Sequence, residues 1–228
     1  MSTERTFFDI DIPDSSRLFF ASDTHFGHRR LVTSCPTHFE RCRRYETVEE
    51  MNADIVSKWN TEVTPADTVV FLGDFLFGRF DEFEKAASDM WNSLNGVKFF
   101  VRGNHDQGIR GELIEIRDYA LVKYRGRTYL CQHFPFGNGP DSDMSVLGGL
   151  KSSLEPADTV LVHGHTHFSD RVSRTLRKDF SLQNDVSWEA WYGMVPAEKL
   201  YAANRTYVGK CLGHPVVADF SKECTDEQ

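Results

Sequence analysis

The sequence predicts an α/β fold in which strands and helices alternate along the chain. Short apolar runs, too short for helices, alternate with longer segments whose apolar residues recur at helical spacing. Most of these apolar runs lead at once into a polar loop that carries Asp, His or Asn. Because α/β sheets place functional loops at the carboxyl ends of their strands, the pattern indicates a site at one edge of a sheet.

Short apolar runs bounded by turn residues define the strands. The predicted strands are residues 18–22, 68–72, 97–101, 119–124, 128–132 and 159–162, with an N-terminal strand within 1–16 and further strands around 180–186, 206–212 and 215–220. The segment Arg125-Gly126-Arg127 between two of these runs reads as a hairpin turn.

Two longer helices are expected between the strands. The first covers residues 47–60, where Thr47 and Glu50 form a capping-box pattern ahead of apolar residues at helical spacing. The second covers residues 81–94 and ends at Gly96, which suits a left-handed cap. Shorter helical segments are expected within 29–45 and within 109–118.

The composition is that of a globular protein: 228 residues, of which 40% are hydrophobic and 26% are charged. A single domain over residues 1–228, with a polar tail over about 221–228, is expected for this length.

No apolar stretch is long enough to span a bilayer and none resembles a signal peptide, so no membrane partner is expected. Five cysteines without a CxxC pair favour a reducing, cytoplasmic compartment over a disulfide framework. A net charge of -8 disfavours duplex nucleic acid as a partner.

Side chains that can bind a metal follow the predicted strands. They are Asp23, His25, Asp74, Asn104, His105, His133, His165 and His167. A histidine-rich surface turn would explain the run from His163 to His167 alone, but the recurrence after other strands favours a metal site. Oxygen and imidazole donors without a thiolate suit Mn²⁺, Zn²⁺ or Fe better than Ca²⁺ or an iron–sulfur cluster. The set exceeds the needs of one ion, so it predicts two divalent ions about 3.5–4 Å apart that share Asp74.

Five motifs occur in order along residues 23 to 167. They are Asp23-x-His25, Gly73-Asp74, Gly103-Asn104-His105-Asp106, His133 and Gly164-His165-Thr166-His167. This order resembles the calcineurin-like metallophosphoesterase superfamily, in particular its small single-domain bacterial and phage members. The resemblance implies a four-layered α/β/β/α sandwich, with two mixed sheets packed face to face and helices outside.

The resemblance also implies a role for each residue of the site. Asp23, His25, Asp74 and His167 would bind one metal, and Asp74, Asn104, His133 and His165 the other. The two cations, Mn²⁺ first with Zn²⁺, Fe or Ni²⁺ as alternatives, would acidify a bound water and offset charge on the phosphoryl group. His105 is the candidate general acid for the leaving group, and Asp106 would orient its imidazole and hold it protonated.

Several further residues have two readings. His28 would either contact the phosphate or serve only its loop, and Arg102 would face the phosphate or form a salt bridge. His163 is expected to be buried and hydrogen-bonded on its strand rather than to bind a metal. The segment 184–191 resembles the region that small family members place against the site entrance. Trp188, Trp191 and Tyr192 could stack a base, although core packing is the commoner use of such residues.

These predictions describe a dinuclear-metal phosphoesterase that hydrolyses a phosphodiester of a small, soluble, nucleotide-like substrate. A metal-bound hydroxide would attack directly, without a phosphoenzyme, and activity on phosphomonoesters stays open. One alternative is a nuclease acting on nucleic-acid ends, which needs a local basic surface. The candidate cluster for that surface is Arg29, Arg30, Arg41, Arg43 and Arg44. The other alternative is a non-catalytic binding module of the same fold, which would be expected to lose ligands that this chain retains. The oligomeric state stays open.

Overall fold

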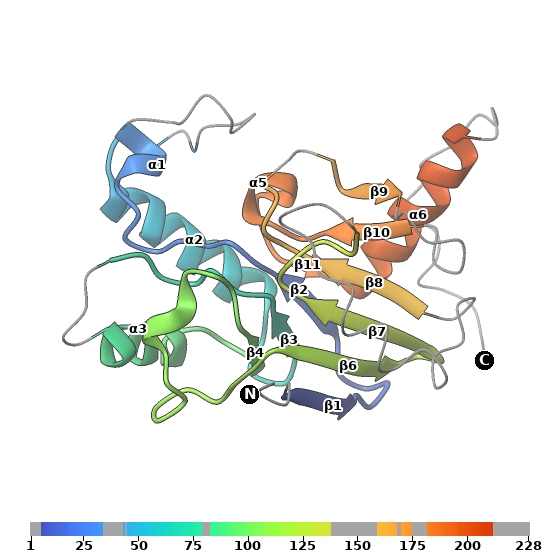
Figure 1. Ribbon diagram of the computed structural model, residues 1–228, viewed down its shortest axis with the longest axis horizontal. Coiled ribbons are helices and arrows are strands. Elements are labelled where there is room, and N and C mark those ends of the chain that lie inside the picture. The colour runs from blue at the N-terminus through green and yellow to red at the C-terminus, as the bar shows by residue number, and fades with distance from the viewer. Residues whose placement is uncertain are drawn as a thin grey trace.

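The computed structural model describes residues 6–33, 43, 45–78, 83–137, 159–167, 170–174 and 182–211. Two mixed β-sheets pack against each other, and two long helices cover the outer face of one of them (Figure 1). The predicted α/β class with two mixed sheets is therefore confirmed.

The first sheet has five strands and carries the N-terminal motifs. Its order is β11 (Val195–Pro196), β2 (Leu18–Ala21), β3 (Thr68–Phe71), β4 (Val97–Val101) and β5 (Ile116–Arg117). Strands β2, β3, β4 and β5 are parallel, and β11 runs antiparallel to β2. The carboxyl ends of the parallel strands therefore meet at one edge, as their polar loops led us to expect.

The second sheet has six strands. Its order is β1 (Phe7–Asp11), β6 (Tyr119–Tyr124), β7 (Arg127–Gln132), β8 (Thr159–His163), β10 (Leu182–Asp185) and β9 (Val172–Arg174). Arg125 and Gly126, with φ of 48° and 71°, form the two-residue turn between β6 and β7. Positive φ at both positions matches the right-handed twist of a hairpin, which confirms the predicted turn.

Helices α2 (Val48–Glu62) and α3 (Phe83–Asn92) cover the five-stranded sheet. The Thr47 hydroxyl accepts a hydrogen bond from the Glu50 amide at 3.1 Å, so the predicted cap is present. Within the described ranges the other helices are α1 (Arg30–Thr33), the 3₁₀ turn η1 (Asp106–Gly108), α5 (Trp188–Trp191) and α6 (Ala197–Cys211). Helix α6 contacts β2 and β11 of one sheet and β9 and β10 of the other, so it lies against both.

The core consists of two apolar layers, one on each face of the five-stranded sheet. On β2, Phe19 faces the helices, whereas Phe20 faces the other sheet. The ring of Phe20 lies 5.3 Å from that of Tyr129 on β7, across the space between the sheets. Burial on both faces explains why these strands are continuous apolar runs rather than alternating ones.

Two local predictions are wrong. The segment 109–118 contains no helix; the chain makes η1 just before it and β5 within it. Residues 206–211 belong to α6, although Tyr207 and Val208 favour a strand, because α6 buries Leu200 against both sheets and this packing outweighs local propensity.

Other predictions lie beyond what the structure tests. The strand around 215–220 and the tail over 221–228 fall outside the described residues. The fourth layer, helices over the outer face of the six-stranded sheet, stays a prediction. Among the described residues, no helix combines the length and apolar character needed to cross a membrane.

Candidate metal centre

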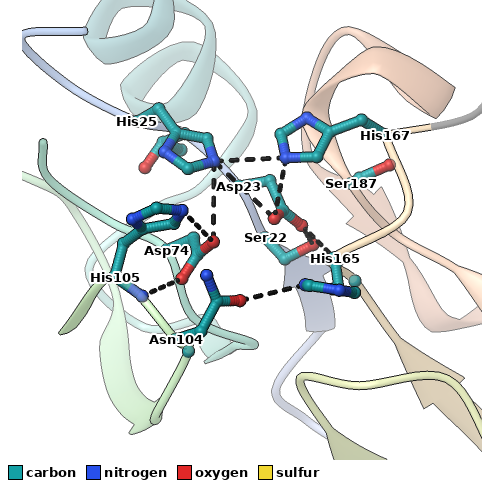
Figure 2. A network of polar contacts seen from close by, with 12 residues as sticks. Ser22, Asp23, His25, Asp74, Asn104, His105, His165, His167 and Ser187 are labelled. Carbon is teal, nitrogen blue, oxygen red and sulfur yellow. Dashed lines mark hydrogen bonds and ion pairs between the residues drawn. The ribbon is translucent and has the colours of Figure 1, made fainter. Parts of the chain in front are cut away.

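The polar loops of both sheets meet at one end of the sandwich and bring the predicted ligands together (Figure 2). On the five-stranded sheet, the loop after β2 carries Asp23 and His25, the loop after β3 carries Asp74, and the loop after β4 carries Asn104. On the six-stranded sheet, the loop after β7 carries His133, and the loop after β8 carries His165 and His167. Residues from both sheets therefore build one centre.

Asp23, His25 and His167 form the first ligand cluster. The Nε2 atoms of His25 and His167 lie 3.2 Å apart, and His167 Nε2 lies 3.3 Å from Asp23 Oδ1. Three donor atoms that converge within this distance can bind one cation.

Asp74, His133 and His165 form the second cluster, with Asn104 beside it. His133 Nε2 lies 3.1 Å from His165 Nδ1, and both nitrogens lie 2.9 Å from Asn104 Oδ1. The opposite ring nitrogen of His133, Nδ1, lies 2.7 Å from the Leu72 carbonyl, to which it donates. This hydrogen bond leaves the lone pair of Nε2 directed into the cluster.

Asp74 lies between the two clusters. Its Oδ2 is 3.7 Å from His25 Nε2 and 3.5 Å from His133 Nε2, and its Oδ1 accepts a hydrogen bond from the His105 amide at 2.8 Å. This position suits the bridging role expected for Asp74.

Two observations indicate that these residues suit a pair of divalent cations: the oxygen and imidazole donors themselves, and a buried carboxylate oxygen of Asp23 that lacks a hydrogen-bond partner among the described residues. Asp23 is fully buried, and its Oδ2 accepts hydrogen bonds from the Ser22 hydroxyl and the His165 amide. Its Oδ1 has no hydrogen-bond partner in the described part of the chain and faces the imidazole nitrogens. A buried carboxylate oxygen left in this state is costly, and a cation would satisfy it.

The electrostatics of the centre point the same way. Burial raises the pKa of both Asp23 and Asp74 to about 6, because two carboxylates are held out of water. Burial also lowers the pKa of His25 and of His133, which keeps these imidazoles neutral as ligands must be. His167 differs: burial lowers its pKa, but Glu189 and Asp23 raise it more, to about 9.

The backbone of the ligand loops is strained. Asp23, His25, Asp74, His165 and His167 all have φ between 46° and 73°, in the left-handed region. Residues other than glycine rarely adopt this backbone conformation, because it costs about 1–3 kcal/mol for each residue. The abrupt turns direct successive side chains of each loop towards one point, so the strain serves the geometry of the centre.

Two glycines of the motifs allow the loops to approach one another. A Cβ at Gly103 would collide with Asp74 Oδ1 and the Asp74 amide, and a Cβ at Gly164 would collide with Ser22 Oγ and Asp23 Oδ2. Only glycine fits at these contacts.

His105 lies at the edge of the centre and is open to solvent. Its side chain is 43% exposed, and its Nε2 is 3.9 Å from Asp74 Oδ2. The pKa of His105 is lowered, because burial outweighs the opposing charge of Asp106.

Asp106 makes hydrogen bonds that we did not predict. Its carboxylate accepts from the amides of Asp74 at 2.7 Å, Gly103 at 2.8 Å and Phe75 at 3.1 Å. Asp106 therefore joins the loops after β3 and β4. Its charge raises the pKa of His105 less than burial lowers it, so Asp106 does not hold the ring protonated here, and its orienting of the imidazole stays a prediction.

The structure gives contacts for His28, Arg102 and His163, for each of which the sequence left two interpretations open. The His28 ring stacks on Phe77, with centroids 3.7 Å apart, next to His25. Arg102 donates to the carbonyls of Asp106 and Ile109, which supports its loop; a contact with phosphate stays a prediction for both residues. His163 is buried on β8 and lies 2.8 Å from the Gly164 carbonyl through Nδ1, as expected.

The structure also shows the burial and contacts of the aromatic and basic residues considered for substrate binding. Trp188 is fully buried, which supports the core reading. The Trp191 indole donates to the Asp185 carbonyl at 2.8 Å, and Arg171 lies over its ring. Arg29 and Arg30 are exposed, but Arg43 is only 2% exposed, so it does not belong to the basic surface expected for a nuclease. Arg41 and Arg44 lie outside the described residues.

Sequence reasoning missed Glu189. This residue is 1% exposed and its Oε2 lies 2.9 Å from His167 Nδ1. It follows Trp188, one of the candidates for stacking a base, but no spacing in the sequence connects it to His167.

Comparison with known proteins agrees with this geometry. The model of the calcineurin-like phosphoesterase family matches residues 16–225. An uncharacterised protein of Methanocaldococcus jannaschii is 30% identical over 151 residues, which cover 66% of this chain and 69% of the relative. The gene 66 protein of Mycobacterium phage L5 is 26% identical over 207 residues, 82% of this chain and 93% of the relative.

A solved structure shows the same fold. The protein of unknown function AQ665 from Aquifex aeolicus superposes with a TM-score of 0.56 at 22% identity, covering 82% of this chain and 98% of that one. With the match to the family model over most of its length, these observations establish that the chain belongs to the calcineurin-like phosphoesterase family.

Proposed function

We propose that the protein is a dinuclear-metal phosphodiesterase that hydrolyses a small, nucleotide-like substrate. The observation that carries the proposal is the position of Asp74 Oδ2, 3.7 Å from a nitrogen of one cluster and 3.5 Å from a nitrogen of the other. A carboxylate shared between two three-residue clusters is the arrangement that a two-cation phosphoesterase needs.

Two divalent cations, with Mn²⁺ as our first choice for these hard oxygen and imidazole donors, would acidify a water and neutralise charge on the phosphoryl group. The protein supplies the remaining parts. The buried ligands exclude bulk water on one side, and the exposed imidazole of His105 stands where a leaving oxygen can take its proton.

Two partly exposed aromatic rings favour a nucleotide-like substrate. Phe77 lies 5.4 Å from the His105 ring on one side of the centre, and Phe134 lies 4.8 Å from the His165 ring on the other. Flat rings at such positions can stack a base, a contact worth about 1–3 kcal/mol.

The test uses metal-stripped protein with Mn²⁺ added back and esters that share one leaving group. We expect turnover of bis(p-nitrophenyl) phosphate that requires Mn²⁺, a lower rate on p-nitrophenyl phosphate, and a higher kcat/KM on thymidine 5′-(p-nitrophenyl phosphate) than on methyl p-nitrophenyl phosphate.

Asp74→Asn is the control, and it should lower the diester rate by roughly 100-fold or more because the shared ligand is lost. Diester turnover that does not need Mn²⁺ or Asp74 would refute the two-cation mechanism. Equal kcat/KM on the thymidine and methyl esters would refute the nucleotide preference alone.

A further inference from the structure

A buried ion pair lies behind the first ligand cluster. Arg43 Nε donates to Glu189 Oε1 at 2.8 Å, and the side chains of both residues are 1% exposed. Removing two charges from water is costly and is repaid only when both partners make further good hydrogen bonds. Neither residue belongs to the motifs that identify the family, so the use of these further bonds is informative.

Glu189 uses its second oxygen on a ligand of the centre. Its Oε2 lies 2.9 Å from His167 Nδ1, while His167 Nε2 faces Asp23 Oδ1 at 3.3 Å. An acceptor at Nδ1 fixes the ring orientation and holds the Nδ1 proton, so that Nε2 is the nitrogen that faces the centre and would bind a cation once the cation displaces its proton.

Arg43 uses its remaining N–H groups on the loop that carries the other two ligands. Its two terminal nitrogens donate to the main-chain carbonyls of Asp23 and Thr24. This loop holds Asp23 at φ 57° and His25 at φ 46°, both in the left-handed region. The guanidinium thus holds a strained turn in the conformation that brings Asp23 and His25 together.

The second cluster has supports of its own. His133 is oriented by the Leu72 carbonyl at 2.7 Å, and Asp74 is held by the amide of His105 at 2.8 Å. The Asp106 carboxylate joins the loops that carry Asp74 and Asn104. The hydrogen bonds of Arg43 and Glu189 given above reach only the loop after β2 and His167.

We propose that Arg43 and Glu189 are positioning residues that preorganise one of the two metal positions, the one formed by Asp23, His25 and His167. The pair connects the loop after β2 of one sheet to the loop after β8 of the other. It sets the affinity of that position and affects the position of Asp74, His133 and His165 much less, through the hydrogen bond between Asp23 and the His165 amide. This inference rests on the two-cation centre of the proposed function.

The test measures binding of Mn²⁺ to metal-free protein in two backgrounds that separate the positions. His133→Ala removes a ligand of the second position, and His25→Ala removes a ligand of the first. In the His133→Ala background, Glu189→Gln is expected to raise the Kd for Mn²⁺ by about 10–100-fold, as loss of such a supporting partner does elsewhere. In the His25→Ala background, the same substitution should leave Kd within about threefold.

Two further variants guard against a general loss of structure. The double variant Arg43→Met with Glu189→Gln removes both charges, so no buried charge is left alone, and it should show the same selective loss. Asp67→Asn is the control, because it also removes a buried carboxylate that is paired with an arginine, here the half-exposed Arg17 at 2.6 Å, but at the opposite end of β3 from Asp74. Asp67→Asn should leave both Kd values unchanged.

The outcomes separate the inference from the proposed function. Wild-type protein that binds fewer than two Mn²⁺ ions would remove the two-cation centre, and this inference with it. Wild-type protein that binds two ions, with Glu189→Gln weakening both positions equally or neither, would overturn the inference alone. A selective loss at the first position supports it. If metal-free Glu189→Gln is no less stable to heat than metal-free Asp67→Asn, whose Kd values are unchanged, the loss of affinity comes from positioning and not from a weakened fold.

Discussion

At the scale of single residues, the chemistry of the centre divides between buried and exposed groups. Asp23, His25 and His133 are almost fully buried, whereas the His105 side chain is 43% exposed beside them. A metal ligand gains from exclusion of water, but a general acid must reach the leaving oxygen. Although burial lowers the pKa of His105, an anionic phosphate next to the ring would favour its protonated form.

His105→Ala is therefore expected to keep both metals and lose turnover. On a diester with a poor alkyl leaving group the rate should fall by roughly 100-fold to 10,000-fold, because the departing alkoxide needs a proton. On a p-nitrophenyl ester, whose leaving group needs little protonation, the loss should be much smaller. Steady-state kinetics on the two esters, with metal content measured in parallel, check this. Equal losses on both esters would show that His105 supports the structure instead of acting as an acid.

The sequence identified these residues but not their supports. Asp23 and His25 could be predicted because a short polar motif after an apolar run is visible in the chain itself. Arg43 and Glu189 could not, because they are separated by 146 positions and meet only when the two sheets pack. The same limit applies to Asp106, whose hydrogen bonds go to backbone amides on two different loops.

At the scale of elements, parallel strands must enter the sheet in register if their carboxyl ends are to meet. Arg17, just before β2, donates to Asp67, just before β3, at 2.9 Å from Nε and 2.6 Å from Nη2. Asp67 also accepts from the amide and hydroxyl of Thr64. Although burial opposes it, these hydrogen bonds and the charge of Arg17 lower the pKa of Asp67 to about 2.

Asp67→Asn should consequently destabilise the protein in a way that depends on pH. The pKa of Asp67 falls from its ordinary value of 3.8 to about 2 on folding, so its contribution is complete above about pH 4 and is lost as the pH falls towards 2. The Arg17 side chain is 52% exposed, so solvent screening limits the decrease in the free energy of unfolding at pH 7 to about 1–2 kcal/mol. Urea unfolding of both proteins between pH 7 and pH 3 measures this. If the difference in unfolding free energy between wild type and Asp67→Asn stays constant or grows below pH 4, Asp67 does not stabilise the fold through its charged form.

At the scale of the whole molecule, the centre connects the two sheets. Asp23, His25 and Asp74 belong to loops of the five-stranded sheet, and His133 and His167 belong to loops of the six-stranded sheet. A cation bound between them would join the sheets at one end, and it would also offset the repulsion between buried carboxylates whose pKa is raised to about 6.

Removal of metal should therefore lower the thermal stability of the protein. Mn²⁺ at about 100 times its Kd stabilises the folded state by about 2.7 kcal/mol per site, which corresponds to a Tm shift of roughly 5–10 °C for a chain of this size. Thermal unfolding of chelator-treated protein, with and without added Mn²⁺, tests this. Asp74→Asn should show a much smaller shift. The same Tm with and without Mn²⁺ would mean that no cation binds preferentially to the folded state.

The sequence alone predicted the α/β class, most strands, helices α2 and α3, and the candidate ligands that the fold brings together. Each of these depends on residues close together in the chain: the period of apolar positions, a capping residue, or a donor directly after a strand. It missed α6 altogether and expected a strand over 206–212, where tertiary packing outweighs the strand propensity of Tyr207 and Val208. The distances within and between the two clusters and the burial of Arg43 against Glu189 were decided only by the tertiary structure. These features arise from contacts between loops of different sheets, and sequence spacing carries no information about distances across that interface.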